Sequence, residues 1–148
     1  MKAEHTARRV VVDSNIWISA ALSVDGAPAR VARRVLSNGL PVVTSETFAE
    51  LEDRLWLPKF DRYLSLELRR RILHDLNAAA MWVDVPADIA AQSLCRDAGD
   101  DAFIHAALAA QAPWLVTGDR DLLEMTGIAG LRILSPADAL NDAAFLPD

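Results

Sequence analysis

"VVVDSNIWIS", residues 10–19, places a carboxylate and two small polar side chains directly after three valines. The valines form a β-branched run that is typical of a buried strand. Asp13, Ser14 and Asn15 are ordinary turn and cap residues, which is one explanation of their position. The other explanation is chemical, because open α/β sheets bind ligands at the carboxyl ends of their strands. The rest of the chain must favour one of the two.

Strand-like and helical segments alternate along the sequence. Short apolar runs predict strands at 9–13, 41–45, 81–85, 114–118 and 131–135. Apolar residues at helical spacing, with cap and stop residues, predict helices at 27–38, 45–56, 65–80, 86–95, 100–111, 119–125 and 136–143. Strands separated by helices pair in parallel through crossovers. We therefore predict a three-layer α/β/α domain with four or five parallel strands.

Composition limits the class of protein. A length of 148 residues with 52% hydrophobic residues suits one domain with a single core, which we expect over residues 9–148 after a disordered start at 1–8. The chain has no apolar stretch long enough to span a membrane, and its start lacks the apolar middle of a signal peptide, so we expect a cytoplasmic protein. The single Cys95 excludes an internal disulfide and a zinc site built from several cysteines. The net charge of −6 argues against a nucleic-acid coat protein, but not against an enzyme that acts on nucleic acid through bound cations.

Carboxylates recur at predicted strand ends and helix starts in four separate segments. They are Asp13, Glu46, Glu50, Asp97, Asp100, Asp101, Asp119 and Asp121. On a parallel sheet these positions share one edge, where the negative charges repel each other unless a cation neutralises them. Carboxylates without a His or Cys cluster favour Mg²⁺ or Mn²⁺ over zinc. Such a site could activate a water for attack on a phosphodiester.

The simpler interpretation is that these acids cap helices. Taken singly, Asp100, Asp119 and Asp121 are more ordinary as caps than as metal ligands. Asp13 is harder to explain in this way, because no helix is predicted to begin there. The coincidence of four segments favours a shared metal site.

Four stretches together resemble the PIN-domain family and, more narrowly, the VapC-like toxin components of bacterial toxin–antitoxin pairs. They are "VVVDSNIWISAAL", "TSETFAELEDRLWLPKF", "DAGDDAFIHAALAAQAPWLVTGDRDLLEM" and "GIAGLRILSPADAL", and they cover roughly residues 9 to 140. The resemblance implies a Rossmann-like α/β/α fold and a Mg²⁺- or Mn²⁺-dependent endoribonuclease that hydrolyses RNA. It further implies an antitoxin partner that blocks the site and, commonly, a homodimer.

The resemblance also implies which residues form the site. The family's four catalytic and metal-binding acids fall on Asp13, Glu50, Asp101 and Asp119. The remaining matches are Asp121 as an accessory metal ligand and Ser14, Asn15 and Thr117 as supporting polar residues.

Two of these assignments have alternatives. Glu46 could replace Glu50, although Leu51 after Glu50 matches the family pattern. Asp100 could replace Asp101, although the spacing to Phe103 and Ile104 favours Asp101.

Basic and aromatic residues supply weaker candidates. Two clusters could bind RNA phosphates, although charge runs are more often solvated: Arg30, Arg33 and Arg34 on one helical face, and Arg69, Arg70 and Arg71 on another. Lys59 is a further candidate. Trp17 and Trp56 lie near acidic positions and could stack on bases if their rings are exposed. His105 is expected to be structural, because His is not a preferred Mg²⁺ ligand.

Two other classes compete with a nuclease. A phosphoacceptor receiver domain has an acidic pair at its first strand and a late Lys, whereas here the last Lys is Lys59. A non-catalytic PIN-like module that binds RNA or protein would use the same acids only as caps. Metal binding at this edge of the sheet separates the second class from a nuclease.

Overall fold

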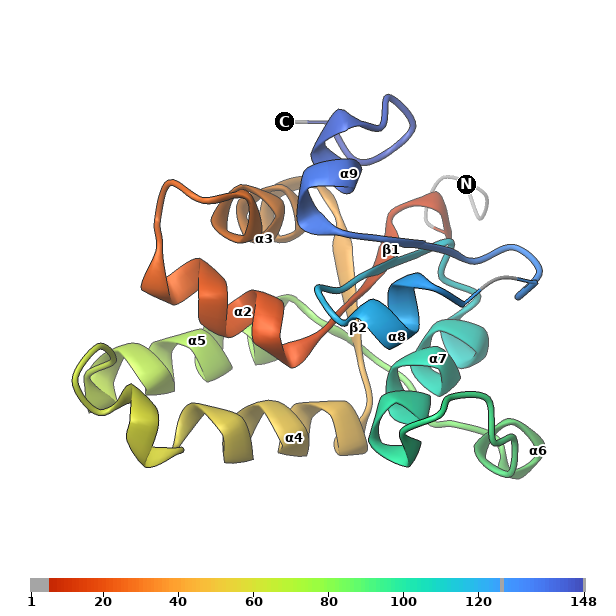
Figure 1. Ribbon diagram of the computed structural model, residues 1–148, viewed down its shortest axis with the longest axis horizontal. Helices are drawn as coiled ribbons and strands as arrows, with labels where there is room; N and C mark the ends of the chain where they lie inside the picture. Colours follow the sequence, from red (N-terminus) through yellow and green to blue (C-terminus); the bar gives the residue numbers. More distant parts are fainter. Residues whose placement is uncertain (1–5, 126, 148) are drawn as a thin grey trace.

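Five parallel strands form a single sheet at the centre of the molecule, in the order β3-β2-β1-β4-β5 (Figure 1). The structure is a computed structural model and describes residues 6–125 and 127–147. The strands are β1 (Arg9–Val12), β2 (Leu40–Val43), β3 (Met81–Trp82), β4 (Trp114–Val116) and β5 (Arg132–Leu134). The predicted parallel α/β architecture is confirmed.

Helices connect the strands and cover both faces of the sheet (Figure 1). They are α2 (Ser14–Leu22), α3 (Ala27–Asn38), α4 (Ser45–Leu55), the 3-10 turn η1 (Pro58–Phe60), α5 (Leu66–Ala79), α6 (Ala87–Ala90), α7 (Ala98–Ala110), α8 (Arg120–Leu123) and α9 (Pro136–Asn141). No helix within the two described ranges is long and apolar enough to cross a membrane.

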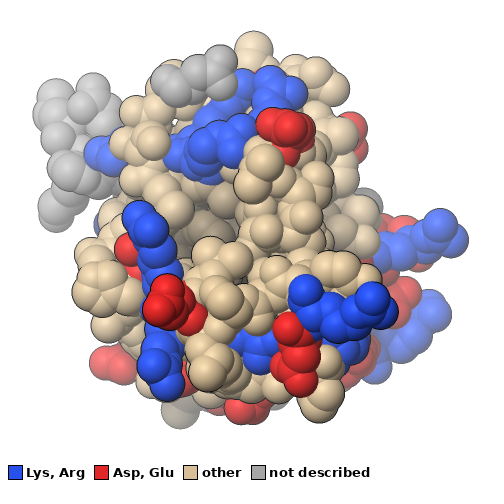
Figure 2. Space-filling view, turned by 90° about the vertical axis from the view of Figure 1, so that its left-hand side faces the viewer, with Lys and Arg blue, Asp and Glu red and all other residues tan. Residues whose placement is uncertain are grey.

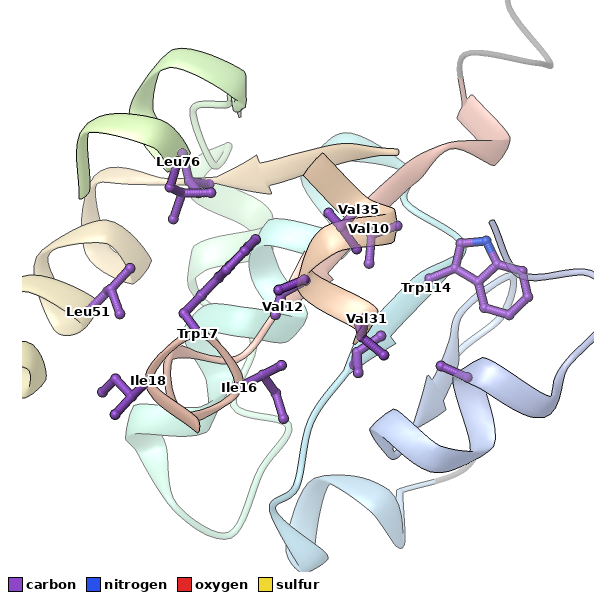
Figure 3. Packing of buried hydrophobic residues seen from close by; sticks show 14 of the residues in the cluster. Val10, Val12, Ile16, Trp17, Ile18, Val31, Val35, Leu51, Leu76 and Trp114 are labelled. Carbon is purple, nitrogen blue, oxygen red and sulfur yellow. The ribbon is translucent and has the colours of Figure 1, made fainter. Parts of the chain in front are cut away.

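The valines of β1 alternate between the two faces of the sheet. Val10 and Val12 pack in one cluster with residues of α2, α3, α4, α5 and α9 (Figure 3). Val11 packs in a second cluster with residues of α7 and α8. Successive side chains of a strand point to opposite faces, so a central parallel strand is apolar throughout when both faces are covered. The carboxyl end of β1 is thereby held rigidly in the middle of the sheet, where Asp13 follows.

A helix begins directly after Asp13, which we had not predicted. The Asp13 side chain caps α2, with the Asn15 amide donating to its Oδ1 at 3.3 Å. Ile16, Trp17 and Ile18 are all buried, so this helix has apolar residues around most of its circumference. An amphipathic helix is identified in a sequence by apolar residues at helical spacing opposite a polar face, and this helix does not show that pattern. The buried Trp17 ring also excludes the base-stacking role considered for it.

Two other predicted helix boundaries are corrected. The N-cap of α4 is Thr44 and not Ser45, because Thr44 and Thr47 form a reciprocal capping box. The helix predicted at 86–95 contains only α6. Beyond α6, the amides of Leu94 and Cys95 donate hydrogen bonds to the carboxylate of Asp101. These amides therefore have a side-chain acceptor and not the backbone carbonyls that they would have in a helix.

The predicted disordered start lies partly outside the described residues, which begin at residue 6. Ala7 and Arg8 are bound to the domain. The indole of Trp114 donates to the Ala7 carbonyl at 3.2 Å, and the Arg8 guanidinium donates to the Asn38 carbonyl at 2.7 Å.

Arg69 is a structural residue, so the basic cluster at 69–71 does not present three side chains to RNA. Its side chain is 3% exposed, pairs with Asp61 at 3.0 Å and lies 5.3 Å over the ring of Trp56. A guanidinium that is buried in this way contributes packing of its stem as well as charge. The ring of Trp56 is still 40% exposed, so a base could reach it.

We expect Arg69→Gln to lower the free energy of unfolding by about 1–3 kcal/mol, because it removes a buried guanidinium with an ion pair. The matched variant Arg70→Gln changes an exposed neighbour and should be nearly neutral. Urea unfolding of both variants measures the difference. Equal stabilities would contradict the structural role of Arg69.

Candidate active site

Thr117 joins two of the predicted acids at the ends of β1 and β4. Its hydroxyl is fully buried, donates to Asp13 Oδ2 at 2.7 Å and accepts from the Asp119 amide at 3.0 Å. The Asp13 amide in turn donates to the Val116 carbonyl at 3.0 Å. Because β1 and β4 are adjacent and parallel, the two acids leave the sheet at the same edge. Both side chains also cap helices, since Asp119 Oδ1 accepts from the Asp121 amide at 2.8 Å at the start of α8.

Glu50 reaches this edge from α4 and is bound by polar groups on both of its oxygens. The Ser14 hydroxyl donates to Glu50 Oε2 at 2.8 Å, and Arg54 lies 3.3 Å from Glu50 Oε1. Arg54 also donates to the Asn15 side chain at 3.4 Å. The two residues after Asp13 therefore connect the first strand to α4. Sequence analysis missed Arg54, although its position four residues after Glu50 on a helix was a usable signal.

Asp100 is the residue of α7 that experiences the charge of the other acids. Burial and the negative charges of Asp119, Asp97, Asp13 and Glu50 raise the pKa of Asp100 from 3.8 to about 6. The cap of α7 is Asp97, whose side chain accepts from the Gly99 amide at 2.9 Å. Asp97, and not Asp100, is therefore the cap of this helix. Asp100 contributes its charge to an acidic cluster that consists of Asp13, Glu50, Asp100 and Asp119.

Asp101, the residue that the sequence favoured over Asp100, instead supports a loop. Its Oδ1 accepts from the Leu94 amide at 3.0 Å and from the Cys95 amide at 2.6 Å. Burial acts to raise the pKa of Asp101, but hydrogen bonds from the Cys95 thiol and from these two amides hold it below its usual value. The side chain is only 7% exposed. The structure thus separates the two neighbours into one acid that belongs to the cluster and one that fixes residues 94–95.

His105 and Cys95 complete the support of this loop. The ring of His105 is buried, and its Nε2 lies 2.7 Å from the Gln92 carbonyl. Burial and the neighbouring charge of Asp101 raise the pKa of the Cys95 thiol to about 12, so it stays protonated.

The other predicted site residues are more exposed or lie against other groups. Glu46 is exposed in the first turn of α4, and Asp121 is exposed in the first turn of α8. Lys59 lies 5.1 Å over the ring of Phe60. The three arginines of α3 line a basic pocket with Ser37: Arg30, Arg33 and Arg34.

The cluster has the chemistry of a site for a hard cation, although its side chains are not converged on one point. Within residues 6–125 and 127–147, no three Asp, Glu, His or Cys side chains are close enough together to hold a metal as they stand. Asp13 and Glu50 accept hydrogen bonds from hydroxyl groups, while Asp100 and Asp119 are only half-buried. Carboxylate oxygens are the donors that hard divalent cations prefer, so the chemistry of these residues fits such a cation.

A family model described as the PIN domain matches residues 9–121. The match covers about three quarters of the chain and includes all the acids of the cluster. The chain belongs to the PIN domain family. It is 30% identical over 126 residues to the uncharacterized protein MJ1680 of Methanocaldococcus jannaschii, covering 84% of this chain and 79% of that protein.

A solved structure shares the fold of this PIN domain. It is the crystal structure of VapBC2 from Rickettsia felis bound to a DNA fragment from their promoter. The superposition has a TM-score of 0.57 with 16% identity, and it covers 86% of this chain and 98% of the matched chain. At this level of identity, the likeness establishes the common fold.

The acidic cluster predicts an unusual pH dependence for the metal-free PIN domain. Because the pKa of Asp100 is raised on folding, the native state binds more protons than the unfolded chain between about pH 6 and pH 3.8. The charged form of Asp100 thus destabilises the protein above pH 6, and this penalty disappears as the pH falls. We expect Asp100→Asn in EDTA to gain about 1 kcal/mol, or about 3 °C in Tm, at pH 7.5, because solvent screens part of the repulsion.

The same gain should shrink as the pH falls through 6 and be nearly absent at pH 4. Thermal unfolding of wild type and Asp100→Asn at several pH values measures it. A difference in Tm that is the same at pH 7.5 and pH 4 would show that Asp100 is not repelled by the other acids.

Proposed function

We propose that this PIN domain is a Mg²⁺- or Mn²⁺-dependent endoribonuclease that hydrolyses RNA phosphodiester bonds in the cytoplasm. The observation that carries the proposal is that Asp13, Glu50, Asp100 and Asp119 lie at one edge of the sheet, where burial and the charges of the other acids raise the pKa of Asp100. Carboxylates that lie close together repel one another when all of them are ionised, and this repulsion destabilises the fold. A bound cation offsets the repulsion, so such a cluster favours a cation-binding role. The ribonuclease activity implied by the family resemblance fits this donor set.

The four acids would hold the metal directly or through water, with Asp100 in the place that the sequence had favoured for Asp101. When bound, the metal would lower the pKa of a water and stabilise charge on the phosphate. Asp13 is held most rigidly, because it is 5% exposed and bonded to Thr117. Glu50 and Asp119 are also hydrogen-bonded, but they are less buried than Asp13, so their side chains have more room to adjust to the substrate.

Arg54 would bind a phosphate oxygen of the RNA. It is 44% exposed, and its ion pair with Glu50 places a cation beside the acids. Arg54 could exchange the carboxylate of Glu50 for a phosphate of the RNA, because a guanidinium binds both groups through two parallel N–H donors. The side-chain oxygen of Asn15 accepts a hydrogen bond from Arg54 in this structure, and it would orient a water at the same edge of the sheet.

We also propose that the protein is the toxin of a toxin–antitoxin pair and that it forms a homodimer. The likeness to a chain of VapBC2 supports this role, as does an apolar pocket between α2, α3 and α5. Trp17, Leu36 and Ile72 are among its lining residues, and its volume is about 200 Å³. An apolar helix of an antitoxin would fit such a surface.

The test is cleavage of a labelled single-stranded RNA by purified protein in Mn²⁺, in Mg²⁺ and in EDTA. Asp119→Asn is the inactivating variant, and Asp88→Asn, an exposed acid of α6, is its matched control. We expect cleavage by wild type and Asp88→Asn only with metal, and none by Asp119→Asn. Metal-independent cleavage, or equal cleavage by all three proteins, would contradict the proposal. Loss of cleavage in every sample together with RNA binding would favour the non-catalytic binding module.

A further inference from the structure

A further groove is lined in part by Asp119. It lies between α2, the start of α3 and the start of α9, and its volume is about 460 Å³. Its lining residues include Ser19, Ala27, Pro28, Ser135, Pro136 and Ala137. This volume lies within the roughly 300–1,000 Å³ that is usual for small-molecule sites.

The lining of the groove is neutral and mostly apolar. Among the described residues that line it, Asp119 is the only one with a charged side chain, and it lies at the end shared with the acidic cluster. Pro28 and Pro136 contribute apolar rings, and Ser19 and Ser135 contribute hydroxyls that can donate or accept hydrogen bonds. A phosphate would find no cation here, whereas a nucleobase needs an apolar surface and a few hydrogen-bonding groups at its edges.

The space beside Gly118, the residue before Asp119, is open. Gly118 separates Thr117 from Asp119, and a Cβ added to it would meet no atom within 4 Å. Packing therefore does not require glycine at this position. The groove and the acidic cluster share Asp119.

Beyond the groove, α3 presents positive charge. Ala27 lines the groove, and Arg30 follows one helical turn later on the same face of α3. Arg30 lines the basic pocket of about 220 Å³ together with Arg33. On the face shown in Figure 2, Lys and Arg side chains gather in the upper part, the level at which α3 lies in Figure 1. An acidic cluster, a neutral groove and a cationic pocket therefore follow one another.

We propose that the groove binds one nucleoside of the RNA strand, adjacent to the phosphate that is cleaved at the acidic cluster. The next phosphate of the strand then lies against Arg30. This order matches the alternation of phosphate, nucleoside and phosphate along a single strand. The inference rests on the proposed ribonuclease function, and it makes the residues of the groove the determinants of base preference.

The first experiment detects nucleoside binding without cleavage. Adenosine, guanosine, cytidine and uridine are titrated separately into metal-free, isotope-labelled protein, and amide shifts are followed by NMR. We expect shifts at groove residues such as Ser19 and Ala137, with one nucleoside binding at least about threefold more tightly than the others. Ala137→Trp fills the groove from an exposed position of α9, and it should abolish these shifts. Ala78→Trp, at an exposed position of α5, is the matched control and should bind as wild type does.

The second experiment measures cleavage of four short RNAs that differ only in the base next to the cleaved bond. For Ala137→Trp we expect KM to rise about tenfold with little change in kcat, and the preference among the four RNAs to be lost. Nucleosides that shift no groove residue would overturn the inference, whether or not the protein cleaves RNA. Groove shifts in a wild type that cleaves nothing would overturn the ribonuclease and leave a nucleoside site. Cleavage with unchanged preference in Ala137→Trp would overturn the role in specificity.

Discussion

Asp100→Asn is expected to lower metal-dependent RNA cleavage on the order of 100-fold or more, whereas Asp101→Asn should retain most of it. Asp100 is repelled by Asp119, Asp97, Asp13 and Glu50, so it belongs to the set of carboxylates that a cation would neutralise. Asp101 is occupied by the amides of Leu94 and Cys95. Initial cleavage rates in saturating Mn²⁺ compare the two variants.

The stabilities of the same two variants should change in the opposite sense. Asp101→Asn replaces the charged acceptor of two partly buried hydrogen bonds from amides by a neutral one, and it should cost about 1–2 kcal/mol. Asp100→Asn removes repulsion and should not destabilise the metal-free protein. This reversal distinguishes loss of a catalytic acid from simple unfolding. An inactive, stable Asp101→Asn beside an active Asp100→Asn would restore the assignment that the sequence favoured.

Thr117→Val is expected to weaken Mn²⁺ binding by about 10–100-fold, because its hydroxyl orients a carboxylate that would bind the metal. The hydroxyl is the donor to Asp13 Oδ2 at 2.7 Å and the acceptor of the Asp119 amide. Valine keeps the shape of the side chain but leaves that amide without a protein acceptor, which should also cost about 1–3 kcal/mol. Calorimetric titration with Mn²⁺ measures the affinity.

Thr117→Ser is the control for this variant, because it keeps the hydroxyl and removes only a methyl group. We expect its Mn²⁺ affinity to stay within about threefold of wild type. An affinity of Thr117→Val equal to that of wild type would exclude Thr117 as the residue that positions Asp13. A loss in Thr117→Ser as large as in Thr117→Val would assign the effect to packing rather than to the hydroxyl.

Asp13 and Asp119 cap helices and also lie in the acidic cluster, so the two positions are compatible for the same acids. The sequence posed them as alternatives, yet Asp13 and Asp119 cap α2 and α8 while lying in the acidic cluster. At the carboxyl end of a parallel strand the next helix begins at once, so one carboxylate can bind the first amides with one oxygen and face the cluster with the other. Asp100 is the informative exception, because the cap of its helix is Asp97.

Local patterns in the sequence were sufficient for the strands, their parallel pairing and the edge at which the acids gather. These features depend on residue type and period, which the chain displays directly: three valines buried on two faces, and acids after strands. The helix after Asp13 was missed for the same reason, since Ile16, Trp17 and Ile18 show no polar face. Only tertiary packing buries such a helix on several sides.

Tertiary structure alone gives the adjacent acids Asp100 and Asp101 their different surroundings. Asp100 and Asp101 have the same side chain, and their spacing to other motifs differs by one residue. On a helix that difference turns the side chain by about 100°, so one carboxylate faces the other strand ends and its neighbour faces residues 94–95. The direction in which each carboxylate points depends on how α7 packs against β1 and β2. These two strands are distant from α7 in the sequence. The groove beside Asp119 likewise exists only where α2, α3 and α9 meet.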